Sequence, residues 1–244
     1  MKLGLSLGLS GQQHSGPSAF TPAQLALSGW WRASYAGSPW AGTASGGASG
    51  GRNVSEATNP PSVGPLQNGF AAALFDGTND QLRTAITVDN FVSNGAGSIW
   101  ALFLAVSAGA DSGAGSRFNN KGIVANDGGG TMMNLTFSTA GVSALLFSSG
   151  WKDVTLACGT GAYHLAQMRW NGTLLGLRID SGAWSTVACA ATSFSGGAVV
   201  LGRNFGTAFQ NMGLLDVGTA QSTFDDATFD DIKSYCNTQY ALAL

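Results

Sequence analysis

YHLAQMRW (163–170), NG (171–172) and TLLGLRID (173–180) follow one another directly in the chain, and WSTVAC (184–189) comes after a second turn at Ser181-Gly182. An Asn-Gly pair between two apolar segments is the strongest short-range signal for a two-residue β-hairpin. Ser181-Gly182 signals the next turn in the same way. Together these residues predict a three-stranded antiparallel meander.

Further strands are predicted on both sides of the meander. Residues 98–106, SIWALFLAV, are apolar at nearly every position, which is typical of a strand buried on both faces at the centre of a sandwich. Shorter apolar segments separated by Gly, Ser and Asp-Gly turns predict the remaining strands at residues 70–75, 82–88, 122–124, 132–137, 142–147, 198–202 and 211–217.

The first part of the chain has a different character. Leucines alternate with small residues from Leu3 to Leu9, which predicts a strand within an N-terminal arm at residues 1–20. Thr21 followed by Pro22 predicts a short helical turn. Residues 36–69 are rich in Gly, Ser, Pro and Asn around Trp40. They predict one long loop, and loops of this length usually carry a function.

The C-terminal segment predicts the one helix of the fold. Phe229, Ile232, Cys236 and Tyr240 recur at intervals of three and four residues, which places them on one helical face. Thr228 is the expected N-cap, so the helix is predicted over about residues 229–240. Many short strands with a single terminal helix predict an all-β fold in which two antiparallel sheets pack as a sandwich.

The composition argues against several functional classes. Charged residues make up only 10% of the chain, its formal net charge is −2, and its eleven Lys and Arg residues are scattered. Nucleic-acid binding needs clustered cations, so no nucleic-acid partner is expected. The longest apolar run is too short to span a bilayer, and no signal peptide is recognised, so we expect synthesis in a cytoplasm without membrane insertion. Three widely spaced cysteines predict buried apolar side chains rather than a metal site.

Several of these motifs resemble those of concanavalin A-like (laminin-G-like) jelly-roll domains. The segment 74–82, LFDGTNDQL, is similar to a strand motif of that family, and residues 163–182 are similar to its central hairpin. Residues 200–204, VLGRN, and the terminal helix resemble two further family motifs. The resemblance covers roughly residues 20–242. It implies a two-sheet jelly roll in which residues 21–244 form a single domain.

The resemblance also suggests what such a domain does, although a fold alone does not select a function. Trp30-Trp31-Arg32 looks like the opening segment of phage virion proteins of this type. The leading hypothesis is therefore a non-enzymatic phage virion protein, either a capsid decoration or a fibre or tail component. Its partners would be other virion proteins and further copies of itself. The N-terminal arm and residues 36–69 are the expected docking parts.

Two alternatives remain at this stage. The first is a carbohydrate-binding module or a receptor-binding adhesin, which would bind a glycan on the host surface. The second is a glycoside hydrolase, which needs a pair of carboxyl groups about 5 Å apart for retaining chemistry. Glu56 is the only glutamate and lies in the Gly/Ser segment. The Asp residues near the terminal helix suit its dipole. No enzymatic activity is therefore expected.

Two tryptophans are the candidates for contact with a glycan or a protein partner. Trp40 and Trp151 lie in predicted loops, whereas Trp100, Trp170 and Trp184 lie in predicted strands and suit core packing. No catalytic partner is identifiable for His164.

A calcium site is the one cofactor hypothesis. Asp76, Asn79 and Asp80 fall within a single turn, and Ca²⁺ binds where several oxygen ligands converge. Turn chemistry is the alternative explanation, because Asp and Asn side chains accept hydrogen bonds from nearby backbone N–H groups. No other cofactor is expected.

Overall fold

The computed structural model describes residues 20–32, 35–44, 52–56, 58–93, 95–128, 133–147, 150–190, 194, 196–204 and 208–244. The predicted strand at residues 3–9 lies outside these ranges. The predicted helical turn is confirmed as the 3-10 helix η1 (Pro22–Gln24). The backbone N–H of Thr21 donates a 2.9 Å hydrogen bond to Oε1 of Gln24 and closes that turn.

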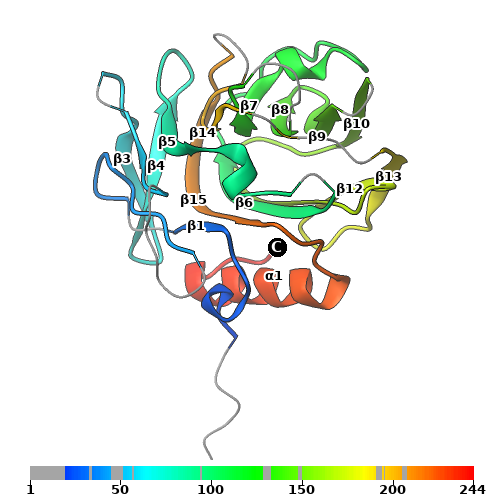
Figure 1. Cartoon of the computed structure of the whole chain (residues 1–244). Helices are drawn as coiled ribbons and strands as arrows, with labels where there is room; N and C mark the ends of the chain where they lie inside the picture. Colours follow the sequence, from blue (N-terminus) through cyan, green and yellow to red (C-terminus); the bar gives the residue numbers. More distant parts are fainter. Residues whose placement is uncertain are drawn as a thin grey trace, which may run out of the picture.

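Two antiparallel sheets face each other across the main core (Figure 1). The eight-stranded sheet, sheet A, has the order β13-β12-β11-β6-β15-β4-β3, with β1 also paired to β15. Its strands are β13 (Ser185–Ala188), β12 (Leu174–Ile179), β11 (Tyr163–Trp170), β6 (Gly97–Ala105), β15 (Asn211–Ala220), β4 (Phe70–Asp76), β3 (Ser62–Gln67) and β1 (Gly29–Arg32).

The seven-stranded sheet, sheet B, has the order β10-β9-β8-β7-β14-β5-β2. Its strands are β10 (Trp151–Leu156), β9 (Gly141–Phe147), β8 (Met133–Ser138), β7 (Lys121–Asn126), β14 (Ala198–Leu201), β5 (Leu82–Thr87) and β2 (Val54–Ser55). Two further 3-10 turns are η2 (Val88–Asn90) and η3 (Arg117–Asn119). The predicted sandwich is confirmed.

Strand β6 shows why sheet A is buried on both faces. Its alternate residues Ile99, Ala101 and Phe103 belong to the core between the sheets. Trp100 and Leu102 point the opposite way, into a second apolar cluster that includes Phe229 and other residues of the C-terminal helix. The helix α1 (Asp226–Tyr240) lies along this outer face of sheet A (Figure 1). The prediction that residues 98–106 form a central strand is thus confirmed.

The predicted meander is confirmed as β11, β12 and β13, with Met168 opposite Leu177 and Gly176 opposite Thr186. The helix begins earlier than predicted. Asp225 rather than Thr228 is the N-cap, and its carboxylate accepts a 2.8 Å hydrogen bond from the N–H of Thr228. The Thr228 hydroxyl donates to the same carboxylate, because Thr228 stands in the first turn and not before it.

The prediction that residues 36–69 form one loop is wrong. The range contains β2 and β3, together with an isolated bridge between Trp40 and Val54. Strand β3 escaped recognition because Gly64 and Pro65 interrupt its apolar pattern. Proline is tolerated there because β3 is an edge strand, where an N–H group is not needed for the ladder.

The three cysteines are free thiols. Cys236 is buried in the cluster under α1, and Cys158 and Cys189 are half-buried against the main core. Burial raises the pKa of the Cys158 thiol to about 12, with the negative charge of Asp180 adding to the rise. Within the described ranges, no helix combines the length and the apolar character needed to span a membrane.

Candidate functional site

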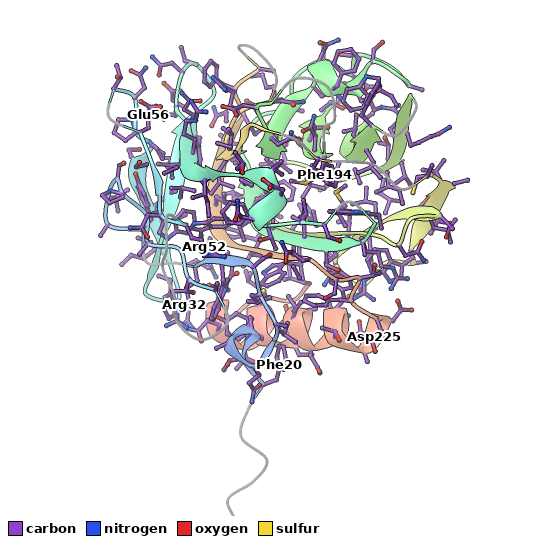
Figure 2. All side chains as sticks on the ribbon, viewed as in Figure 1. Phe20, Arg32, Arg52, Glu56, Phe194 and Asp225 are labelled. Atoms are coloured by element: carbon purple, nitrogen blue, oxygen red, sulfur yellow. The ribbon has the colours of Figure 1, made fainter. Side chains whose placement is uncertain are left out.

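One candidate site in the described structure lies beside β1. Trp31 of this strand is fully buried in the core between the sheets. Trp30 points to the other side, toward the cluster under α1. Arg32 follows two residues after Trp30, so its side chain leaves the strand on the same side as Trp30. The side chain of Arg32 is exposed, and Figure 2 shows Arg32 and Asp225 toward opposite ends of α1.

A cavity of about 580 Å³ opens at this point. Its described lining residues are Trp30, Arg32, Ala36, Pro39, Trp40, Ala41 and Thr43. Cavities of roughly 300–1,000 Å³ are typical of small-ligand sites. Two other cavities are smaller, at about 290 Å³ beside Arg169 and Leu174 and about 300 Å³ between Phe20 and α1.

Hydrogen bonds fold the segment around residues 39–43 against β1. The backbone N–H of Thr43 donates to the carbonyl of Trp30 at 3.0 Å, and that of Trp30 donates back at 2.8 Å. The indole Nε1 of Trp40 donates to the carbonyl of Arg32 at 2.8 Å. These bonds fix the backbone on both sides of the cavity, so the lining is formed before any ligand binds.

A buried carboxylate supports the inner side of the cavity. Asp216 of β15 is opposite Arg32 in the strand register and is fully buried. It accepts hydrogen bonds from the indole N–H groups of Trp30 at 2.9 Å and Trp100 at 3.0 Å. Burial raises its pKa to about 6, while these hydrogen bonds, one from Tyr240 and the charge of Arg32 oppose the rise.

The structure corrects the expectation for Trp40. Its side chain is only 3% exposed, and its ring meets that of Tyr35 edge to face at a centroid distance of 5.7 Å. Trp40 therefore lines the cavity without offering an open ring face to a sugar. Its burial follows from the bridge to Val54, in which each backbone N–H bonds the other residue's carbonyl.

Trp151 is also placed differently from the expectation, because it begins strand β10 and does not lie in a loop. One face of its ring is stacked on Phe118, with centroids 4.7 Å apart and planes 10° from parallel. Phe147 meets it edge to face at 5.3 Å. The structure does not bring Trp151 and Trp40 together, since β10 and β2 are opposite edges of sheet B and Trp40 is bridged to β2.

The carboxylates of Asp76 and Asp80 are engaged by their own turn. Asp76 accepts hydrogen bonds from the N–H of Thr78 at 2.7 Å and of Asn79 at 3.2 Å. The bond from Thr78 is the main cause of the lowered pKa of Asp76. Asp80 accepts from the N–H of Asp76 at 2.9 Å. Across the described residues, no group of three or more His, Cys, Asp and Glu side chains could hold a metal ion.

The polar residues considered for catalysis also have structural partners. Oxygens of Glu56 accept hydrogen bonds from the N–H of Thr58 at 3.1 Å and from Nε2 of Gln81 at 2.9 Å. Nδ1 of His164 lies 2.7 Å from Oδ2 of Asp180. Sequence reasoning missed Trp30 and Arg32 as site residues. The only signal was a cation two positions after an apolar residue in a short strand.

No protein-family model matches this chain, and no curated protein sequence matches it. Solved structures do match. The binding domain of botulinum neurotoxin serotype G has a TM-score of 0.61 at 7% identity, with 87% of this chain and 51% of that chain covered. Trypanosoma rangeli sialidase in complex with sialic acid has a TM-score of 0.58 at 11% identity, with 86% and 33% covered.

A third match is domain 4 of AbnA, an extracellular arabinanase from Geobacillus stearothermophilus, in complex with arabinotriose. Its TM-score is 0.50 at 13% identity, and 73% of this chain and 82% of that chain are covered. The chain thus spans about half of the toxin binding domain and a third of the sialidase. At these identities the matches show the shared sheet-rich, jelly-roll-like fold.

Proposed function

We propose that this chain is a non-enzymatic binding module that holds a glycan in the cavity beside β1. The observation that carries the proposal is the cavity of about 580 Å³, in which Trp30, Trp40 and Arg32 surround a preformed space. Ligand sites are typically concave and mostly apolar, with a few fixed polar groups that orient the ligand. Here the polar groups are the Arg32 guanidinium and the exposed Thr43 side chain.

The chemistry of the lining favours binding over hydrolysis. Glycoside hydrolysis uses two carboxyl groups that flank the scissile bond. The described residues that line this cavity include neither Asp nor Glu, and the carboxylate behind it, Asp216, is fully buried. The similarity to the solved binding domain of botulinum neurotoxin serotype G supports a binding role.

A glycan array with the labelled protein tests this proposal, followed by calorimetry with each bound glycan. Ala41→Trp should abolish binding, because Ala41 is exposed at the cavity and an indole there would fill the space. Ala183→Trp is the matched control, since Ala183 is exposed in the turn before β13. Equal binding by both variants would place the glycan elsewhere. No binding to any glycan would refute the proposed function.

A structural role in a phage virion is the second candidate. It is supported by the low charge content of 10% and by two exposed apolar side chains on edge strand β3, Val63 at 55% and Leu66 at 68% exposure. Apolar residues at an exposed edge suit a protein contact. Quantitative mass spectrometry of purified particles tests it: a fixed copy number per particle is expected, and absence from particles would refute it.

A further inference from the structure

Arg32 differs from the other arginines of the chain. Arg83, Arg117, Arg169, Arg178 and Arg203 each form an ion pair with an aspartate. Arg52 donates a hydrogen bond to the carbonyl of Ser28. Arg32 forms no ion pair, although every Asp and Glu of the sequence lies in the described ranges. Its guanidinium is therefore not paired directly with a carboxylate of the chain and can pair with one supplied by a ligand.

The guanidinium of Arg32 is nevertheless held in place. Its Cζ lies 5.2 Å from the centroid of the Trp30 ring, a cation–π contact. The Arg32 backbone is paired with Asp216 in the strand ladder, and its carbonyl accepts the hydrogen bond from the Trp40 indole. A cation fixed in this way at a cavity loses little freedom when a ligand binds, so more of the interaction energy appears as affinity.

The carboxylate of Asp216, opposite Arg32 in the strand register, forms no ion pair with the guanidinium, although the charge of Arg32 lowers the pKa of Asp216. Oδ1 of Asp216 accepts the hydrogen bonds of Trp30 and Trp100, and Oδ2 accepts that of Tyr240 at 2.8 Å. Asp216 is fully buried, whereas Arg32 is exposed at the cavity. The guanidinium donors of Arg32 thus remain available on the side that a ligand would approach.

We infer that this cavity selects a glycan whose bound sugar carries a carboxylate, and that the Arg32 guanidinium recognises that carboxylate. The inference rests on the proposed glycan-binding function. Arginine presents paired N–H donors that match the two oxygens of a carboxylate. The exposed apolar surface of Pro39 suits the apolar face of a sugar ring, and the hydroxyl of the exposed Thr43 suits its hydroxyl groups.

A single cation argues against a polyanionic ligand. The described residues that line the cavity contain no Lys and no other Arg. Highly sulfated chains and nucleic acids bind through many cations at once. One guanidinium beside apolar surface instead suits one anionic group on an otherwise neutral sugar.

The test uses acidic glycans, each paired with its own methyl ester, and a set of sulfated glycans on the same array. The acids should bind at least about tenfold more tightly than their esters, since a hydrogen bond to a charged group contributes about 1.5–3 kcal/mol. Arg32→Gln should reduce affinity for the acid by a similar factor and reduce affinity for the ester much less, so that the preference for the acid is lost. Arg32→Lys should retain part of the preference, because it keeps the charge without the paired donors.

Arg83→Gln is the matched control, because it removes the same charge from a side chain that is 50% exposed on β5 of the other sheet. It should leave acid binding unchanged. Equal affinity for acid and ester in the native protein would overturn the inference while the proposed glycan-binding function stands. Stronger binding of sulfated than of carboxylated glycans would also overturn it. Binding of no glycan at all would instead refute the proposed function.

Discussion

The Tyr240 hydroxyl donates a 2.8 Å hydrogen bond to Oδ2 of the buried Asp216. This bond joins the last turn of α1 to β15, which pairs with β1, β4 and β6. Because Oδ1 of the same carboxylate accepts from Trp30 and Trp100, one side chain connects the helix, the cavity and the centre of sheet A. The attachment of α1 and the shape of the cavity therefore depend on a common group.

Tyr240→Phe should destabilise the fold. The substitution keeps the buried ring and removes one donor to a buried carboxylate, which costs about 1–3 kcal/mol of unfolding free energy. Urea denaturation measures the change. Tyr163→Phe is the control, because the Tyr163 hydroxyl forms no hydrogen bond with another described residue. Equal effects of the two variants would show that the bond to Asp216 contributes nothing.

Asp216 should make the fold more stable in mild acid than at neutral pH. Burial raises its folded-state pKa to about 6 from an ordinary value of 3.8. A raised carboxyl pKa means that the folded state holds the proton more tightly, so this contribution is complete below about pH 4 and is lost as the pH rises through about 6. The shift corresponds to about 3 kcal/mol.

Urea unfolding at several pH values, compared between the native protein and Asp216→Asn, isolates this effect. The asparagine oxygen still accepts the indole hydrogen bonds but does not titrate. The difference in unfolding free energy between the two proteins should therefore change between about pH 4 and pH 7. A difference that is constant with pH would contradict the prediction. Asp76, Asp111 and Asp225 have lowered pKa values and are common to both proteins.

Gly218→Ala should disrupt sheet A where Trp100 crosses β15. Gly218 is opposite Trp100 in the register, and an added Cβ would overlap with the indole ring. Overpacking of this kind costs typically 1–3 kcal/mol and occasionally more, so we expect a loss of about 3 kcal/mol or more because Trp100 also bonds Asp216. In Gly213→Ala, the control on the same strand, the new Cβ would meet its nearest neighbour at 3.5 Å. Thermal unfolding of both variants checks the contrast.

The sequence was sufficient to predict the elements whose structure is set by contacts between residues close together in the chain. At the hairpin, Oδ1 of Asn171 accepts hydrogen bonds from the N–H groups of Thr173 and Leu174, and Gly172 has a φ of +83°. All of these contacts lie within four residues, so the sequence predicts them. The predicted start of α1 differs from the observed start because Asp225 and Thr228 are both good capping residues.

The site could not be predicted in the same way, because long-range pairing creates it. Arg32 reaches the cavity only because β1 pairs with β15, with Arg32 opposite Asp216. Trp40 has Gly, Ser, Pro and Ala around it in the sequence, which indicated an exposed loop. Its burial depends on Val54 and Tyr35, and neither contact has a periodic pattern that reveals it.

Trp151→Ala should weaken the fold and leave glycan binding unchanged. The ring of Trp151 is covered on one face by Phe118 and met at its edge by Phe147, so removing it loses two aromatic contacts of about 0.5–1.5 kcal/mol each in addition to buried area. Phe118 belongs to η3, and the neighbouring Arg117 forms ion pairs with Asp111 and Asp153. The contacts of Trp151 therefore secure a loop on sheet B, whereas the proposed glycan cavity lies beside β1 of sheet A.

Urea denaturation measures the stability change of Trp151→Ala, and calorimetry with a glycan identified on the array measures binding under conditions where the variant is folded. Loss of glycan binding in folded Trp151→Ala would move the binding surface to β10 and contradict the assignment to β1.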